Sequence, residues 1–396
     1  MVFIPQSVHQ QRVDRLIAAL PDAGLDAVFV QGLSSDLQYL LGIDRGAHNQ
    51  TDDNKYGDAV YGALFSANCA PIVLAPRMGA APHVTAELAG GPWAGSVRVI
   101  GDGILSQLED PADVVAEVLA CAGHPRRVGV IARQWAAGIW MMQRAEPTTI
   151  LADASALLTR HRMVKDQHEI ALMRQAAAVT ERSFAAVLSQ LSLGMTANEI
   201  ALAVDRAFQM FGATHPSFHT GIRIAGQGIP ERPVAGRKVG DTPIQPGCVI
   251  TFDIGAVVDG YASDFGRTVF WGEPDARIVE WHSLIMESQA AAIQAMRSGK
   301  ITAGGLNVVA RSVIENAGLG QGFTHRLGHG IGIDVHEEPF LFPGDQTVLE
   351  TGMCFTIEPS IRVPGVAGVR VEDVVMVTPD GGDPFHTYSH DLLVME

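Results

Sequence analysis

The stretch Val249-Ile250-Thr251-Phe252-Asp253-Ile254-Gly255 decides the fold of the second half of this chain. It has the apolar character of a β-strand and carries one carboxylate, which is unusual because a buried carboxylate without a positive partner is costly. Asp259-Gly260 follows, and this pair favours a hairpin turn because both central residues of such a turn need a positive φ. The returning strand begins at a second acid, Asp264. The sequence therefore predicts a hairpin that brings Asp253 and Asp264 close together.

A second hairpin of the same kind is predicted further along the chain. Glu358 ends the apolar run Phe355-Thr356-Ile357, Pro364-Gly365 marks a turn, and Glu372 follows on the returning strand. The segment Gly352-Met353-Cys354-Phe355-Thr356-Ile357-Glu358 also resembles Gly247-Cys248-Val249-Ile250-Thr251-Phe252-Asp253 of the first hairpin. This internal similarity predicts a pseudo-twofold construction with the acidic residues between the two halves.

An imidazole completes a set of potential metal ligands. His329 lies in the glycine-rich segment Gly328-His329-Gly330-Ile331-Gly332. Carboxylates and one imidazole form an oxygen-rich set that favours Mn²⁺, with Fe²⁺, Co²⁺ or Zn²⁺ as alternatives, over copper. Two such ions close together can activate a water molecule and polarise the carbonyl that it attacks. The sequence thus predicts a hydrolytic centre with two divalent metal ions, held by Asp253, Asp264, His329, Glu358 and Glu372.

These ligands in their local frames resemble the pita-bread metallohydrolase family, M24, which includes methionine aminopeptidase, aminopeptidase P, prolidase and creatinase. The run Gly328-His329-Gly330-Ile331-Gly332-Ile333-Asp334-Val335-His336-Glu337-Glu338-Pro339 is similar to the aminopeptidase P and prolidase branch. Near the N-terminus, Leu37-Gln38-Tyr39-Leu40-Leu41-Gly42 resembles the creatinase-type N-terminal domain. The resemblance implies an α/β (α+β) fold, with a smaller creatinase-like α/β domain over residues 1–158 and a pita-bread catalytic domain over residues 159–396.

The resemblance also implies roles for residues of the site. Asp264 and Glu372 would bridge the two metals, with Asp253 on one metal and His329 and Glu358 on the other. Glu358 would also shuttle the proton of the reaction.

Further catalytic candidates surround the ligands. By resemblance, His336 would donate to the leaving nitrogen or to the tetrahedral oxyanion, and His325 would line the substrate pocket; for either, a structural hydrogen bond is the alternative. Arg370 lies two residues before Glu372, so the period-two alternation of a strand puts both on one face. It would then pair with a ligand carboxylate or hold an anionic substrate.

The chain departs from prolidases at two places that bear on the substrate. Prolidases carry a His shortly before the first metal Asp, whereas this chain has none between His219 and Asp253. Prolidases also hold the proline carboxylate with an Arg, and no Lys or Arg lies between Arg326 and Arg362. The proton work would then pass to Glu231, or to a His of an earlier loop. Candidate substrate-binding residues in this variable segment are Glu231, Arg232, His219 and Arg223.

The predicted activity is hydrolysis of an amide C–N bond in a small peptide or small amide. An Xaa-Pro peptide is the main candidate, with the chain acting as a dipeptidase or as an aminopeptidase P. The two departures motivate an alternative, an ectoine-hydrolase-like or creatinase-like enzyme of a non-peptide nitrogen compound. A third hypothesis is a pita-bread module that binds peptides without catalysis.

Composition restricts the partners. The chain has 396 residues, 47% of them hydrophobic, and a net charge of −15, which argues against nucleic acid. The sequence shows no signal-peptide pattern and no apolar run of membrane-spanning length, so a cytoplasmic location without membrane contact is expected. The four cysteines lack metal-site spacing and are interpreted as reduced. A homodimer is expected by resemblance.

Overall fold

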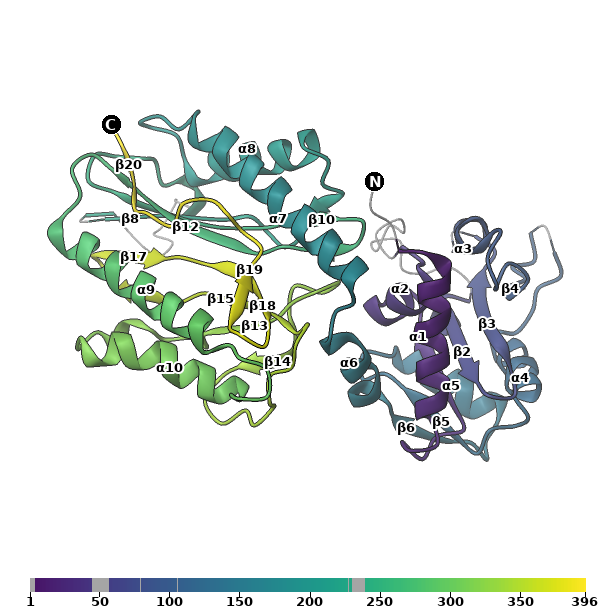
Figure 1. Cartoon of the computed structure of the whole chain (residues 1–396). Helices are drawn as coiled ribbons and strands as arrows, with labels where there is room; N and C mark the ends of the chain where they lie inside the picture. Colours follow the sequence, from purple (N-terminus) through teal and green to yellow (C-terminus); the bar gives the residue numbers. More distant parts are fainter. Residues whose placement is uncertain (1–3, 45–56, 79, 105, 227, 230–238) are drawn as a thin grey trace. The chain divides into compact units, whose positions relative to one another are not determined.

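A computed structural model describes residues 4–44, 57–78, 80–104, 106–226, 228–229 and 239–396, so the predictions for Glu231 and Arg232 fall outside it. The chain divides into two compact units (Figure 1), and the boundary in the sequence falls between Arg162 and Met163. The sequence placed the boundary between residues 158 and 159, which lies inside the helix α6 (Ser155–Met163).

The unit of residues 4–162 is built on one mixed sheet with the strand order β4-β3-β2-β1-β5-β6. Strand β1 pairs antiparallel with β2 and parallel with β5. Side chains of these strands form a core with helices α4 and α5. The elements of this unit before α6 are α1 (Gln6–Ala19), β1 (Ala27–Gln31), α2 (Ser35–Leu41), β2 (Gly62–Ser66), β3 (Cys69–Pro76), α3 (Ala80–Leu88), β4 (Val97–Ile100), α4 (Pro111–Cys121), β5 (Arg127–Val130), α5 (Ala136–Ala145) and β6 (Ile150–Asp153).

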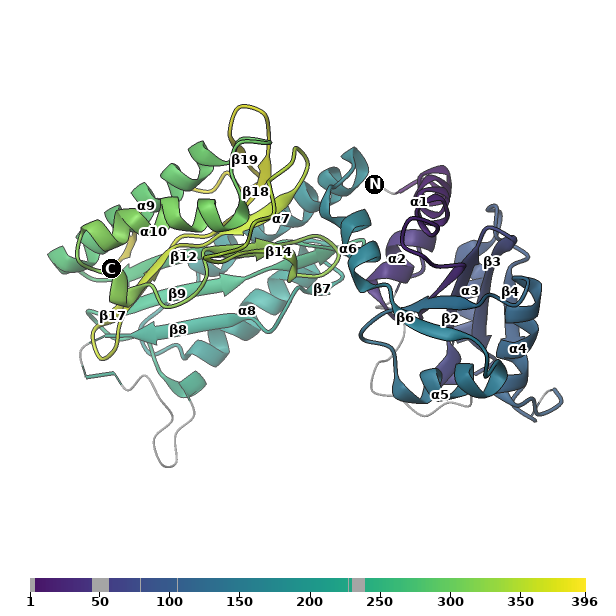
Figure 2. The ribbon, with the colours of Figure 1, turned by 90° about the horizontal axis from the view of Figure 1, so that it is seen from below.

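In the unit of residues 163–396, strands lie between the helix pair α7–α8 and the helix pair α9–α10 (Figures 1 and 2). Its larger sheets have the orders β20-β12-β9-β8 and β14-β13-β15-β18-β19. The first sheet packs mainly on α7 and α8, and the second mainly on α9 and α10. The elements are α7 (Gln167–Leu188), α8 (Ala197–Met210), β7 (His215–Pro216), β8 (Gly221–Ala225), β9 (Val249–Ile254), β10 (Ala256–Val258), β11 (Tyr261–Ala262), β12 (Phe265–Trp271), α9 (Ala276–Ala295), α10 (Ala303–Asn316), β13 (Gly328–Gly330), β14 (Glu337–Leu341), β15 (Cys354–Ile357), β16 (Ser360–Val363), β17 (Ala367–Arg370), β18 (Asp373–Val377), β19 (Gly382–Pro384) and β20 (Leu393–Met395).

Both hairpins predicted from the sequence are present. Asp259 and Gly260 have φ values of 45° and 83°, as the turn between β10 and β11 requires. Strand β9 continues this pairing with β12, in a register that sets Asp253 opposite Gly266. Strands β16 and β17 form the second hairpin, with Gly365 in its turn at a φ of 76°.

The two hairpins meet through a backbone bridge between Gly266 and Glu372. The amide of each residue donates to the carbonyl of the other, at 3.1 Å and 3.0 Å. Gly266 permits this approach, because a Cβ there would lie 2.8 Å from the Cβ of Glu372. This bridge brings the acidic residues of the two hairpins to one place.

No helix in the described part of the chain combines the length and the apolar character that a membrane span requires.

Candidate metal centre and active site

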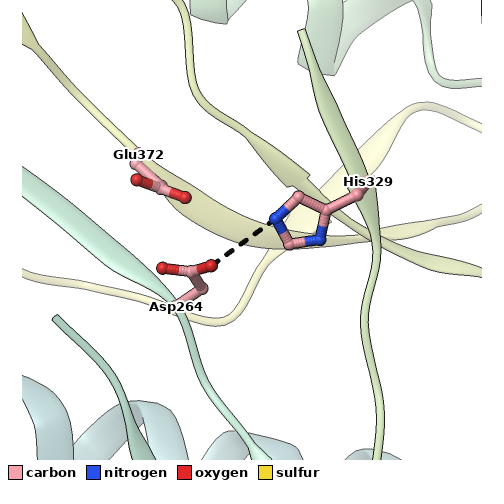
Figure 3. Close-up of side chains that lie close together, drawn as sticks. All are labelled: Asp264, His329 and Glu372. Carbon is pink, nitrogen blue, oxygen red and sulfur yellow. Dashed lines mark ion pairs between the residues drawn. The ribbon is translucent and has the colours of Figure 1, made fainter. Parts of the chain in front are cut away.

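The predicted ligands gather where strands of the two larger sheets meet. Among the described residues, ligand atoms of Asp264, His329 and Glu372 lie within 4.8 Å of one another (Figure 3). All three side chains are buried, and they come from segments far apart in the sequence. Asp264 precedes β12, His329 lies in β13, and Glu372 joins β17 to β18. The fold therefore assembles a buried group of two carboxylates and an imidazole.

The ring of His329 is oriented so that a lone pair faces the carboxylates. Its Nδ1 lies 3.0 Å from the carbonyl oxygen of Gly330, which can only accept, so Nδ1 carries the proton. Its Nε2 therefore has a lone pair, and it lies 3.6 Å from Asp264 and 3.5 Å from Glu358. Burial lowers the pKa of His329 to about 3, which keeps the ring neutral. A neutral nitrogen facing carboxylate oxygens suits a cation between them.

The buried carboxylates have too little positive charge around them to be stable in the ionised form. Asp264 Oδ1 is buried and has no hydrogen-bond partner among the described residues. Burial, together with the neighbouring carboxylates, raises the pKa of Asp264 and that of Glu372 well above the usual range. A divalent cation on these oxygens would lower both pKa values again. The hard oxygen donors, the unpartnered oxygen and the imidazole lone pair thus fit the divalent ions that the sequence predicted.

Arg370 joins several of the carboxylates, as the strand alternation predicted. Its guanidinium lies 2.5 Å from Asp253, 3.3 Å from Glu372 and 3.5 Å from Glu358. One guanidinium cannot balance four ionised carboxylates, so the ionised form of the cluster needs further positive charge. The sequence interpretation of Asp253 as a buried carboxylate was wrong, because its side chain is 40% exposed where β9 borders a cavity.

Glu358 lies directly after β15 and depends on a residue that the sequence analysis missed. The hydroxyl of Thr356 donates to Glu358 Oε1 at 3.2 Å and accepts from the backbone amide of His329 at 3.0 Å. Burial raises the pKa of Glu358 to about 7, although the Arg370 guanidinium opposes that rise. Thr356 therefore connects two predicted ligands, and only its alternation with Glu358 along the strand could have indicated this.

His325 is held at both ring nitrogens. Its Nδ1 lies 2.7 Å from the carbonyl oxygen of Arg326 and so donates, which leaves Nε2 to accept from the Ser360 hydroxyl at 2.6 Å. Burial lowers its pKa to about 4, so the ring is neutral at pH 7. Ser360 was not among the sequence candidates. The ring is therefore fixed in one orientation.

The ring of His336 lies tilted against that of His329, the predicted metal ligand. Its ring centroid lies 4.2 Å from that of His329, at an angle of 57° between the rings. His336 is exposed, whereas its neighbour Glu337 is buried and lies 2.9 Å from Lys165 Nζ. Burial is the main cause that lowers the pKa of His336. The buried ion pair anchors the segment that presents His336.

A cavity of about 780 Å³ opens above these groups. It is lined by the predicted ligands, by the two histidines predicted to be catalytic, His325 and His336, and by apolar side chains. Within the described part of the chain, His219 and Arg223 are exposed and do not line this cavity, whereas the neighbouring Phe218 does. The lining residues are Phe218, Asp253, Asp264, His325, Arg326, His329, Val335, His336, Phe340, Phe342, Glu358, Arg370 and Glu372.

A second buried ion pair supports Glu372 from behind. Arg267 and Asp373 are both fully buried, 2.9 Å apart, and Arg267 also donates to the backbone oxygen of Glu372 at 2.9 Å. Burial would raise the pKa of Asp373, but the Arg267 guanidinium and a hydrogen bond from His390 hold it well below the usual range. The backbone at Glu372 is therefore held by a buried ion pair whose two residues do not line the cavity.

Known proteins are similar to this chain in sequence and in fold over its length. The model of metallopeptidase family M24 matches residues 171–379. A Mycobacterium tuberculosis protein named "probable dipeptidase PepE" is 34% identical over 395 residues, which cover 98% of this chain and 97% of that protein. The crystal structure of a dipeptidase from Pyrococcus horikoshii superposes with a TM-score of 0.83 at 28% identity, over 97% of this chain and 100% of that one.

A shorter match has higher identity. An Xaa-Pro dipeptidase of Lactobacillus helveticus is 42% identical over 241 residues, which cover 60% of this chain and 63% of that protein. Fold, site and relatives together define a metal-dependent hydrolase. The chain belongs to metallopeptidase family M24. The expected fold, an α/β N-terminal domain followed by a pita-bread catalytic domain, is confirmed.

Proposed function

We propose that this protein is a dipeptidase that cleaves Xaa-Pro dipeptides. The observation that carries the proposal is the cavity, which places an acidic metal-type cluster beside an apolar wall. The cluster suits the polar amide bond, and aromatic side chains such as Phe218 and Phe340 suit a proline ring. Relatives over the full chain and over its catalytic part are named dipeptidase and Xaa-Pro dipeptidase.

The proposed cofactor is a pair of divalent ions, Mn²⁺ first among them. Asp253, Asp264, His329, Glu358 and Glu372 would hold these ions, and ligand atoms of Asp264, His329 and Glu372 lie within 4.8 Å of one another. When bound, the ions would lower the pKa of a water molecule and polarise the scissile carbonyl. The neutral ring of His329 supports this assignment, because its Nε2 lone pair faces the carboxylates.

Three side chains would handle the protons and the substrate. Glu358 would accept the proton of the attacking water, because its carboxylate lines the cavity beside the proposed metal ligands and is oriented by the Thr356 hydroxyl. His336, exposed beside the cluster, would donate a hydrogen bond to the developing oxyanion or to the leaving nitrogen. His325 would position the substrate with a ring that Ser360 and a backbone carbonyl hold in place.

Hydrolysis of a small panel by the Mn²⁺-loaded protein, with and without EDTA, tests this function. We expect EDTA-sensitive cleavage of Ala-Pro and Gly-Pro, and loss of that activity in Asp264→Asn. Cleavage of Ala-Pro-Ala alone would instead indicate an aminopeptidase P. Turnover of ectoine or creatine without dipeptide cleavage would favour the non-peptide alternative. Metal binding by the intact site without any turnover would favour the binding module.

Three finer assignments stay predictions. Metal analysis of protein purified without added metal would test Mn²⁺ against Fe²⁺, Co²⁺ and Zn²⁺. Analytical ultracentrifugation would test the expected homodimer. Fractionation of the source cells would test the expected cytoplasmic location.

A further inference from the structure

The cavity contains two guanidinium groups with different surroundings. The Arg370 guanidinium forms ion pairs with the carboxylate cluster. That of Arg326 lies over the ring of Phe340, 4.6 Å from its centroid, and Arg326 is only half-buried. Among the residues that the structure describes, no acceptor forms a hydrogen bond or ion pair with the Arg326 side chain. The cavity therefore presents one cation that is not neutralised by the protein.

The contact with Phe340 leaves the N–H groups of the Arg326 guanidinium available to a ligand, because within the described residues no acceptor binds them. A cation–π contact with an aromatic ring does not use up the N–H donors of a guanidinium. These donors form a planar fork that matches the two oxygens of a carboxylate. The contact with Phe340 also restricts the side chain before any ligand binds, which reduces the entropy lost on binding. Arg326 is thus arranged as a receptor for a planar anion.

The Arg326 guanidinium lies near the residues that are proposed to act on the substrate. Its positive charge contributes to the lowered pKa values of His329 and His336 and favours the ionised form of Glu358. Such effects require that the guanidinium lie near all three groups. Arg326 and the predicted metal ligands also line the same cavity. A ligand inside this cavity can therefore contact both.

We propose that Arg326 binds the C-terminal carboxylate of the substrate and so selects dipeptides over longer peptides. The inference rests on the proposed dipeptidase function. In a dipeptide the carboxylate belongs to the residue that leaves, directly beyond the only peptide bond. A longer peptide has an uncharged amide at that point, which leaves the guanidinium without its anion. Arg326 would therefore fill the role for which the sequence offers no Lys or Arg between it and Arg362.

A pair of substrates that differ only at the carboxylate tests this assignment. The kcat and KM of wild type, Arg326→Met and Arg326→Lys are measured with Ala-Pro and with Ala-Pro amide. We expect Arg326→Met to lose about 10- to 100-fold in kcat/KM on Ala-Pro, mainly through KM, which corresponds to one charge-assisted bidentate contact. Its activity on the amide should stay near that of wild type, and Arg326→Lys should keep part of the preference.

Arg182→Met is the matched control, because the Arg182 guanidinium also lies over an aromatic ring, that of Phe211, at 4.5 Å. Arg182 is exposed and is not part of the cavity lining. This variant should keep the wild-type preference for Ala-Pro over its amide. An equal loss on both substrates in Arg326→Met, or a wild type that does not distinguish them, would overturn the proposal.

Two further arms separate the remaining explanations. If Arg326→Met weakens Asp-Pro relative to Asn-Pro but leaves the ratio of Ala-Pro to its amide unchanged, the anion is an acidic side chain and the C-terminal assignment is wrong. If the wild type cleaves neither Ala-Pro nor the amide, the dipeptidase function fails on its own. Calorimetric binding of the same two compounds then tests Arg326, and equal affinities would contradict its role.

Discussion

At the scale of single residues, Gly266 shows how closely the centre is packed. A Cβ at this position would lie 2.8 Å from the Cβ of Glu372 and 3.0 Å from its Oε2. We expect Gly266→Ala to displace the Glu372 carboxylate and to weaken Mn²⁺ binding by at least about tenfold, as loss of ligand support commonly does. Calorimetric titration with Mn²⁺ measures this, alongside the melting temperature of the apo protein.

Gly95→Ala is the matched control, because a Cβ there meets no atom within 4 Å. It should leave the affinity for Mn²⁺ unchanged. Unaltered metal binding in a folded Gly266→Ala protein would contradict the assignment of Glu372 as a ligand.

Thr356 carries a second prediction at this scale. Valine has the same shape but cannot accept from the His329 amide or donate to Glu358. Because that amide is buried, Thr356→Val should cost about 1–3 kcal/mol in the free energy of unfolding. It should also lower kcat, since Glu358 is no longer oriented. Chemical denaturation and steady-state kinetics measure the two effects.

Thr356→Ser keeps the hydroxyl and should retain most of the stability and of the kcat. If serine and valine behave alike, the hydrogen bonds are not what positions Glu358.

Single residues also show where the sequence was informative. The alternation of a strand predicted that Arg370 and Glu372 share a face, because that geometry is local. Burial is not local: Asp253 lies in an apolar run, yet its side chain opens toward a cavity that distant segments build. Ser360 escaped notice for the same reason, since its partner His325 is 35 residues away.

At the scale of elements, helix α9 carries a buried titratable group. His282 is buried, and its Nε2 has no hydrogen-bond partner within the described residues. Burial lowers its pKa to about 4; Asp391 opposes that change, whereas Arg267 and His390 add to it. The folded protein therefore binds fewer protons at this site than the unfolded chain between pH 4 and an ordinary histidine pKa of about 6.5. Its contribution to stability is complete above about pH 6.5 and falls as the pH falls toward 4.

His282→Leu removes this titration. The variant should lose less stability than the wild type between pH 6.5 and pH 4, with a difference of up to about 3 kcal/mol. Urea denaturation at several pH values measures the slope. Above pH 7 the free energies of unfolding of the two proteins should differ by a constant amount. Parallel curves across the acid range would show that His282 is not buried as a neutral ring.

Helices, strands and turns could be predicted where residues close together in the sequence determine them. The Asp259-Gly260 turn was predicted because its residues must adopt positive φ, and the structure has that turn. The bridge that joins the two hairpins was not predicted, because it depends on Gly266 meeting Glu372 across 106 residues of sequence. A single sequence carries no direct signal for such pairings.

At the scale of the whole molecule, the family resemblance predicted what local patterns could not. Hydrophobic patterning indicated an α/β chain. That the predicted ligands, from the two hairpins and from β13, form one site was predicted from the order of these residues, which is typical of the family. The identity of the substrate could not be predicted from the sequence, for a physical reason. The segment that includes Glu231 and Arg232 has no regular pattern from which its geometry could be inferred.

The two units should respond differently to metal, because each has its own core and the predicted ligands all lie in residues 163–396. A ligand that binds only the folded state stabilises it by about 4 kcal/mol at about 1,000 times its Kd. For a unit of this size, that corresponds to a rise in melting temperature of about 10 °C. Calorimetry should therefore show two transitions, and Mn²⁺ should raise one of them while EDTA reverses the change. Val114→Ala, in the core of residues 4–162, should lower only the other transition. A single transition, or equal shifts of both, would mean that the two units unfold together.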